Sequence, residues 1–264
     1  MNIFFRELKA NLKSLLIWSG VLLLFVFLVT AKFSAFYNDP SMLKMVEALP
    51  KAMIDAMSMR GFNPTTLDGF FGILFIYFAL MGGIAAAMWA SDSISKEERD
   101  KTVEFSLVLP VSRNRVITGK VLAAVVDCIA FVLVTWVCSI VAAQSYKPDQ
   151  AFYKFLALEM EGVFIIELIF LAIGLLLGCV MKQYKRSGST AVAIILVTYI
   201  LSVMSAMKSN LDFLKYFTPF KYFNAAVLLR DGRISGGYLL LSGIIIIVCV
   251  AVAYFTYNRR DLYI

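Results

Sequence analysis

The sequence predicts an all-α, polytopic membrane protein with six transmembrane helices, on three observations. Hydrophobic residues make up 61% of the 264 residues, charged residues make up 16%, and the mean hydropathy is +0.81. Soluble domains are about 45–50% apolar and about 25% charged. A single soluble core of this size could not bury the additional apolar residues of this chain. Six stretches also reach the roughly 20 mostly apolar residues that cross a bilayer. These values exclude a soluble globular protein, a disordered chain and a disulfide-rich secreted module.

The six predicted spans, in order, lie at residues 15–31, 70–90, 121–143, 161–181, 190–207 and 239–257. With both ends of the chain placed in the cytoplasm, the inside segments are 1–14, 91–120, 182–189 and 258–264. They contain 14 of the 25 Lys and Arg residues in less than a quarter of the chain. Because positive charge concentrates in cytoplasmic loops, we expect the N-in and C-in orientation in the cell membrane, such as a bacterial inner membrane.

The spans and their connections form one predicted transmembrane domain over residues 1–264. Residues 1–14 space Phe4, Leu8 and Leu12 four apart, with basic residues toward the other side. This pattern predicts an amphipathic helix in the inner interface, with a plain basic flank of the first span as the alternative. The long outside loops are predicted at 32–69 and 208–238. Aromatic residues fill the second loop, which Pro219 interrupts, and it is too short to span, so we expect a re-entrant or interfacial segment there.

Two residue types narrow the chemistry. The chain has no histidine, which excludes Ser-His-Asp and Cys-His catalysis and His-ligated metals. Its four cysteines lie within apolar stretches without C-x-x-C spacing, so we expect buried apolar residues and no metal site. The net charge of +7 is explained by basic loops that face anionic membrane lipids, so we do not expect a nucleic-acid partner.

The one densely charged segment is the predicted cytoplasmic loop 91–120. Ser95 is expected to cap a helix that carries Glu97 and Glu98 in its first turn, Pro110 to end it, and Ser112 to cap the next helix. A short charged helix between two spans is suited to dock on a soluble partner. The alternative is a solvated loop that obeys the positive-inside rule.

This segment resembles the signature of the type-2 ATP-binding-cassette (ABC) exporter permeases, which runs roughly E-x-x-x-G-T-x-E-x-L-L-x-x-P-x-S-R and then G-K. The usual glycine before the threonine is Lys101 here, and the ending in Arg259, Arg260 and Asp261 is also similar to that family. The residues at matching positions are Glu98, Thr102, Glu104, Leu107, Pro110, Ser112, Arg113, Gly119 and Lys120.

The resemblance implies a permease that pairs with a second copy or a sister subunit. It also implies that loop 91–120 is a coupling helix on a separate ATPase, which binds ATP and Mg. The residues that would dock are Glu97, Glu98, Arg99, Thr102, Glu104, Leu107, Pro110, Ser112 and Arg113. The chain itself has no P-loop, because Gly119-Lys120 is followed by Val121 and lacks the upstream glycine. We therefore expect no catalysis and no bound cofactor in this chain.

Two acidic residues lie within predicted spans, Asp127 in the third and Glu167 in the fourth, and the spans offer no Lys or Arg to pair with them. Ionisable residues at such depth are costly. Asp127 and Glu167 therefore serve either the bundle and subunit contacts or a substrate or ion. Glu159 and Glu161, at the predicted outer edge, are expected to be solvated.

The leading hypothesis is an ABC exporter permease for an amphipathic peptide or drug-like cargo. A stand-alone secondary transporter or channel is the alternative, although neither inverted repeats nor interrupted spans are evident. A membrane-embedded enzyme is the third, and it lacks a recognisable reaction centre.

Overall fold

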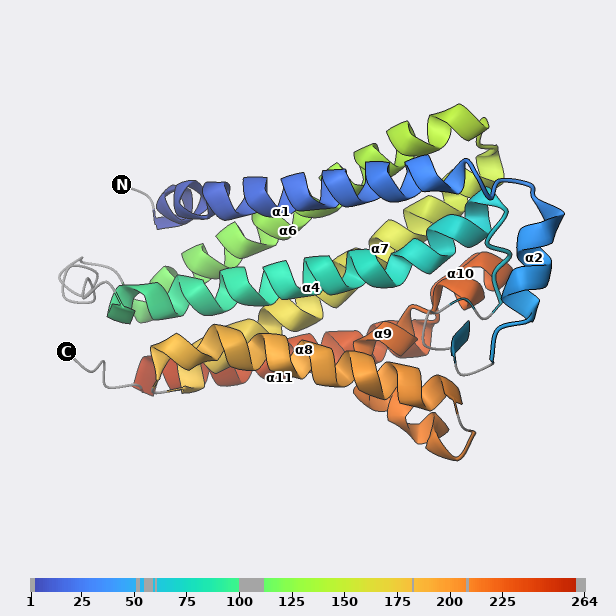
Figure 1. Ribbon diagram of the computed structural model, residues 1–264. Coiled ribbons are helices and arrows are strands. Elements are labelled where there is room, and N and C mark those ends of the chain that lie inside the picture. The colour runs from blue at the N-terminus through green and yellow to red at the C-terminus, as the bar shows by residue number, and fades with distance from the viewer. Residues whose placement is uncertain are drawn as a thin grey trace.

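The structure, a computed structural model, describes residues 3–50, 53–54, 59, 61–99, 112–181, 183–207 and 209–259. Within these residues it is all-α, with six long helices and several short ones (Figure 1). In chain order the helices are α1 (Ile3–Phe33), α2 (Pro40–Glu47), α4 (Leu67–Arg99), α6 (Arg113–Ala143), η1 (Gln144–Tyr146), α7 (Gln150–Val180), α8 (Tyr184–Met207), η2 (Ser209–Phe217), α9 (Pro219–Tyr222), α10 (Ala225–Asp231) and α11 (Gly236–Arg259).

The six predicted spans are confirmed as α1, α4, α6, α7, α8 and α11, each long and apolar enough to cross a membrane. The shortest of them has 24 residues, which corresponds to about 36 Å at a rise of 1.5 Å per residue. The hydrocarbon core of a bilayer is about 30 Å thick, so every one of these helices extends past it or tilts within it.

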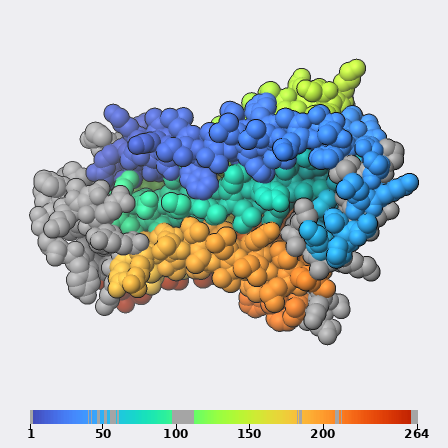
Figure 2. All heavy atoms as spheres, viewed as in Figure 1, coloured from blue at the N-terminus to red at the C-terminus, as the bar shows by residue number. Residues whose placement is uncertain are grey.

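Helices α4 and α7 form the centre of the bundle and share its most extensive contact. Helix α1 packs mainly on α6, α8 on α4, and α11 on α7. We compared the most apolar 18-residue stretch of each helix. The buried share of this stretch is 67% in α4 and 61% in α7, but only 17% in α1, 17% in α8 and 11% in α11. On the face shown in Figure 2, α4 is visible between α1 and α8. The apolar outer surfaces of α1, α8 and α11 are therefore left for lipid or for another subunit.

Small residues bring α4 and α7 close together. A Cβ atom at Gly174 would lie 2.3 Å from the Ala87 carbonyl oxygen, and one at Gly178 would lie 3.1 Å from the Ser91 carbonyl oxygen. Only a residue without a side chain fits at the first of these distances. These small-residue faces therefore pack tightly against each other within the subunit.

The two ends of the bundle differ. Helix α1 begins and α11 ends at the end where α4 stops and α6 starts, and we name it the inner end after the predicted orientation (Figure 1). Helices α2, α9 and α10 lie at the opposite end, which we name the outer end.

The N-terminal segment does not form a separate amphipathic helix. Helix α1 runs without a break from Ile3 to Phe33, since neither proline nor glycine occurs before Gly20. The segment also faces the bundle with its polar side, whereas an amphipathic helix of a soluble protein faces the core with its apolar side. Glu7 and Asn11 are buried, whereas Phe5 and Leu12 are exposed. In a membrane protein the apolar side can face lipid, so the polar side is available for contacts between helices.

The aromatic segment before the last span is broken into η2, α9 and α10, as the sequence predicts. Pro219 stands in the first turn of α9, where its missing N–H costs nothing. Phe220 packs near Phe170 of α7 and Tyr199 of α8, and Tyr222 stacks on Tyr238 of α11 at 5.2 Å. These ring contacts fasten the segment to three spans at the outer end.

Candidate functional site: a polar cluster at the inner end

The first helix presents a polar stripe to the bundle. Glu7, Asn11 and Ser14 are spaced four and three apart, so they lie on one face of α1. Glu7 is 1% exposed and Asn11 is 8% exposed. The Ser14 hydroxyl accepts a hydrogen bond of 3.0 Å from the Trp89 indole N–H of α4.

Two contacts join this stripe to α4 and α6. The Lys96 ammonium of α4 donates to the Glu7 carboxylate and forms an ion pair with it. The Asn11 amide donates to the Asp127 carboxylate of α6 at 2.8 Å. Lys96 and Glu7 also lie within electrostatic range of Asp127. We name Glu7, Asn11, Lys96 and Asp127 the inner polar cluster.

The inner polar cluster corrects one expectation from the sequence. We expected no Lys or Arg of the spans to lie near Asp127. However, α4 continues as a helix beyond its apolar part, and this extension places Lys96 in the bundle interior. A buried carboxylate needs such partners, since desolvation otherwise disfavours its charge. The sequence shows the polar spacing of Glu7 and Asn11, but it does not show which helix faces them.

Lys120 was expected at the end of a loop and is instead a buried residue of α6. It is 1% exposed, and its ammonium donates to the Ser93 carbonyl oxygen of α4. The Gly-Lys pair of the sequence therefore belongs to a helix–helix contact. The predicted loop 91–120 is also shorter than expected, because α4 extends to Arg99 and α6 begins at Arg113.

The predicted docking residues divide into three groups. Glu97, Glu98 and Arg99 form the last turn of α4, and the structure does not describe their side chains. The second group lies outside the described residues and comprises Thr102, Glu104, Leu107 and Pro110. Ser112 and Arg113 are described and stand at the start of α6.

Ser112 is the N-cap of α6, as predicted, and its hydroxyl accepts from the Arg115 backbone N–H at 3.4 Å. The Arg113 guanidinium donates to the carbonyl oxygens of Tyr257 and Asn258, at 3.4 and 3.2 Å. Cations stabilise the carbonyl end of a helix, so Arg113 fastens the start of α6 to the end of α11.

The prediction that Ser95 caps a helix is wrong. Ser95 lies inside α4 and is buried, and its hydroxyl is 2.8 Å from the Ser187 hydroxyl of α8. The Ser91 hydroxyl donates to Ser187 at 2.9 Å. Serine within a continuous helix cannot cap it, and here it forms a hydrogen-bonded contact between two helices instead.

Glu167 is fully buried where α4, α6 and α7 meet. A Cβ atom at Gly82 would lie 2.3 Å from one Glu167 carboxyl oxygen, so the carboxyl group rests against the α4 backbone. The Cys128 thiol of α6 lies within interaction range of it. Neither carboxyl oxygen of Glu167 has a hydrogen-bond partner among the described residues.

The expectation of solvation holds for Glu161 and is wrong for Glu159. Glu161 is exposed, but Glu159 is fully buried, and neither of its carboxyl oxygens has a hydrogen-bond partner within the described part of the chain. Residues two apart point to opposite sides of a helix, so the two cannot share an environment.

The cysteines have free thiols. Cys128, Cys138 and Cys179 are buried, as predicted, whereas Cys249 is only half-buried. In the ranges that the structure describes, no three His, Cys, Asp or Glu side chains gather closely enough to hold a metal ion.

Comparison with known proteins identifies the family. The family described as ABC-2 family transporter protein matches residues 1–262, which is nearly the whole chain. No match was found among curated proteins. The match includes the six spans, the inner polar cluster and the segment between α4 and α6. The chain therefore belongs to the ABC-2 transporter family, whose members are membrane components of ABC transporters.

Proposed function

We propose that the chain is the permease subunit of an ABC exporter and that a separate ATPase subunit, which binds ATP and Mg, docks on residues 91–120. Membership of the ABC-2 family supports the permease role and implies an ATPase partner. The stand-alone secondary transporter or channel remains the alternative. The proposed location is the cell membrane, as in a bacterial inner membrane.

One observation carries the docking proposal. The helices on either side of residues 100–111 are each tied to another span at the inner end. The end of α4 is tied to α1 by the Lys96–Glu7 ion pair, and the start of α6 is tied to α11 by Arg113. A partner that displaces the segment between α4 and α6 would therefore displace α1 and α11 with it.

The outer surfaces of α1, α8 and α11 support a second subunit. These helices expose large apolar residues along their length, among them Leu24, Ile200 and Ile247, each more than half exposed. In the proposed complex, lipids cover part of this surface and a second copy or a sister permease covers the rest.

The proposed cargo is an amphipathic molecule, such as a peptide or a drug-like compound, that moves outward. Asp127 is braced by Asn11 and Lys96, so we assign it a structural role. Glu167 has no amide or cationic partner among the described residues, and it is the group we propose for contact with a cationic part of the cargo. A transport assay in which only a small inorganic ion moves would overturn the cargo proposal.

The test is purification of the tagged chain in mild detergent from its native membrane, with identification of the subunits that accompany it. A stoichiometric ABC ATPase supports the proposal. Recovery of this chain alone, from cells that express such an ATPase, favours the stand-alone transporter.

Glu98→Lys then tests the docking segment, with Lys13→Glu, an exposed change on α1, as the matched control. We expect Glu98→Lys to reduce ATPase association and Lys13→Glu to leave it unchanged. Arg113→Glu is less suitable, because it also removes the contacts with the end of α11. Full association and full transport in Glu98→Lys would contradict the docking assignment.

A further inference from the structure

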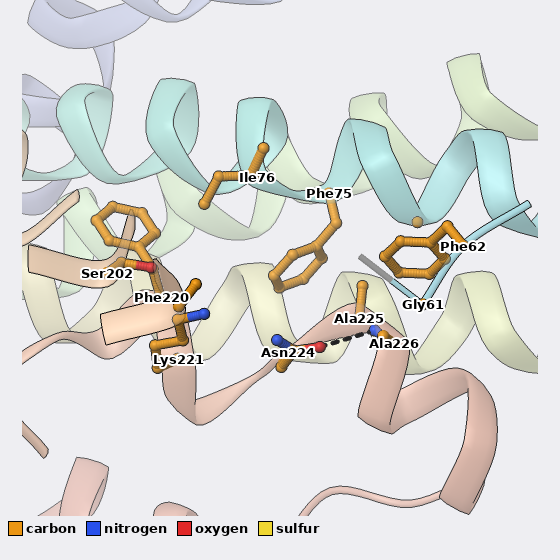
Figure 3. Close-up of a pocket in the computed structure, with 12 residues that line it drawn as sticks. Gly61, Phe62, Phe75, Ile76, Ser202, Phe220, Lys221, Asn224, Ala225 and Ala226 are labelled. Atoms are coloured by element: carbon orange, nitrogen blue, oxygen red, sulfur yellow. Dashed lines mark hydrogen bonds between the residues drawn. The ribbon is translucent and has the colours of Figure 1, made fainter. Parts of the chain in front are cut away.

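A cavity with a volume of about 300 Å³ lies at the outer end, between α4, α8, α9 and α10 (Figure 3). We name it the outer cavity. Ser202 and Ala206 form its α8 wall and lie in the last two turns of that helix, before Met207. In the predicted orientation the outer cavity is therefore inside the bundle and close to the outer surface of the membrane.

Three phenyl rings line the outer cavity, and each comes from a different part of the chain. They belong to Phe62, before α4, to Phe75 of α4 and to Phe220 of α9 (Figure 3). The Phe62 ring is seated on α4, because a Cβ atom at Gly72 would lie 2.2 Å from it. The Phe220 ring centroid lies 5.4 Å from that of Phe170 of α7. Neither Phe62 nor Phe75 has a ring partner among the described residues, so both can receive an aromatic ligand.

Two neutral polar groups line the outer cavity without a hydrogen-bond partner among the described residues. One is the hydroxyl of Ser202, a residue that is only 7% exposed. The other is the NH₂ group of Asn224. The Asn224 side-chain oxygen caps α10, because it accepts from the backbone N–H groups of Ala226 and Val227 at 2.9 and 3.3 Å. The NH₂ group is then on the other side, toward Phe75, and it can only donate to a ligand (Figure 3).

The charge of the lining favours a neutral ligand. The described residues that line the outer cavity include one cation, Lys221, and no acidic side chain. Lys221 already interacts with another group, so it does not require a counterion from a ligand. A cationic ligand would lie close to Lys221 and be repelled by it.

We propose that the outer cavity binds a neutral aromatic molecule that carries a hydrogen-bond acceptor, such as a ketone, ester or amide carbonyl. Its ring would lie among Phe62, Phe75 and Phe220, and its carbonyl oxygen would accept from Asn224 and Ser202. Water would satisfy the two polar groups but not the aromatic wall, and a hydrocarbon would leave both donors unpaired. The volume is at the lower end of the range for small-molecule sites, so a molecule of one or two rings fits best.

The inference names the chemistry of one part of the cargo. Such a molecule would be the aromatic part of the transported compound, and in this respect the inference rests on the proposed function. The outer cavity lies at the end of the bundle toward which an exported cargo would move. Binding itself requires only this chain, so it can be measured without the ATPase.

The experiment is photolabelling of the purified full chain, in a maltoside detergent, with benzophenone, which has two phenyl rings and one carbonyl group. Irradiated benzophenone forms bonds to neighbouring C–H groups, and mass spectrometry of peptides identifies the labelled positions. We expect labels on α4 near Phe75 and on the segment from Phe220 to Ala226, which line the outer cavity. Labels only on the exposed outer surfaces of α1, α8 and α11 would overturn the proposal.

Competition identifies the chemical class of the ligand. At equal concentration in the detergent micelles, 2-acetonaphthone should suppress labelling of the cavity about tenfold more effectively than 2-ethylnaphthalene, which has the same rings but no carbonyl group. Equal suppression by the two compounds would contradict the need for an acceptor. Stronger suppression by 2-naphthoate than by 2-acetonaphthone would identify an anion site and overturn the neutral class.

Two variants test the donors. Asn224→Asp keeps the cap of α10, since Asp and Asn cap about equally well, but it removes the NH₂ group. Ser202→Ala removes the hydroxyl. Each variant should raise the benzophenone concentration for half-maximal labelling of the cavity about threefold to tenfold, with an unfolding temperature close to that of wild type. Unchanged labelling in the double variant Ser202→Ala/Asn224→Asp would overturn the proposal.

Phe62→Leu tests the aromatic wall, with Phe217→Leu, an exposed change at the same end, as the matched control. Phe62→Leu should weaken benzophenone and 2-acetonaphthone to a similar extent, whereas Phe217→Leu should have no effect. The same result for both variants would contradict the aromatic assignment. If benzophenone labels the cavity but no ATPase accompanies the chain, the proposed export function fails and the binding proposal stands. An ATPase that accompanies a chain without such labelling gives the converse.

Discussion

At the scale of single residues, the ion pair of Glu7 and Lys96 has a large electrostatic consequence. The Glu7 carboxylate is 1% exposed, and removal of one partner from a buried pair leaves an uncompensated charge. Arg6 also lies 3.6 Å from Glu7, but its side chain is 41% exposed. Contacts of such exposed cations contribute at most about 1 kcal/mol. The structure therefore depends on Lys96 far more than on Arg6.

We expect Lys96→Met to lower the free energy of unfolding by about 3 kcal/mol, because the buried Glu7 then has only the partly exposed Arg6, 3.6 Å away, as a neighbouring cation. Thermal or denaturant unfolding of the purified chain in detergent measures this loss. Arg6→Gln is the matched control and should cost no more than about 1 kcal/mol. In the double variant Glu7→Leu/Lys96→Met, most of the lost stability should return. An equal loss in Lys96→Met and Arg6→Gln would contradict the assignment.

Tyr222 gives a prediction about pH. Burial, together with the neighbouring Tyr238, raises the pKa of Tyr222 to about 12, from an ordinary value of 10. Its folded pKa is above its unfolded pKa, so its contribution to stability is complete below pH 10 and is lost as the pH rises toward 12. The melting temperature of wild type should fall more steeply over this interval than that of Tyr222→Phe. Parallel curves for the two proteins would refute the assignment.

The sequence revealed only part of the inner polar cluster. Glu7 and Asn11 are one helical turn apart, so their shared face is visible in the chain. Their partners lie 89 and 116 positions away, at Lys96 and Asp127, and no local pattern connects them. The burial of Glu159 was missed for a similar reason, since only the packing of α7 against its neighbours decides which side of the helix is solvated.

At the scale of helices, the contact between α4 and α7 sets the geometry of the bundle. Gly174→Ala should destabilise the protein by about 1–3 kcal/mol, since its Cβ atom would lie 2.3 Å from the Ala87 carbonyl oxygen and the helices would have to separate. Gly243→Ala on α11 is the control, because nothing lies within 4 Å of its Cβ position. It should be neutral or slightly stabilising through helix propensity. Comparison of the two unfolding curves tests the close approach.

The sequence predicted where the spans lie better than where the helices end. Hydropathy identified all six spans, because apolar stretches of this length are typical only of helices that cross a bilayer. It did not find the last turns of α4, since Ser93, Ser95 and Lys96 are polar residues that usually indicate a loop. These residues stay helical because α1, α6 and α8 supply partners for them. Ser112 was predicted correctly as a cap, because its hydroxyl accepts from a backbone N–H only three positions away.

At the scale of the whole molecule, the orientation of the bundle gives a direct test. In a Cys249→Ser background, Lys154→Cys places a thiol at the outer end and Arg115→Cys places one at the inner end, both at exposed positions. We expect a membrane-impermeant maleimide to label Lys154→Cys in intact cells and Arg115→Cys only after the membrane is opened. The three buried cysteines should give little background. The opposite pattern would reverse the predicted orientation.

The ion pair between Glu7 and Lys96 also imposes an order on biogenesis. The two residues are 89 positions apart, so at about 5–20 residues per second a ribosome completes Lys96 roughly 4 to 18 s after Glu7. During this interval Arg6 of the same helix is the cation beside Glu7, and the Lys96 ammonium that pairs with Glu7 in the bundle has not yet been made. Asp127 is synthesised later still, and only then can Asn11 find its partner. The inner end of α1 therefore reaches its final position only when the third span has been made, which places an obligatory waiting step early in membrane insertion.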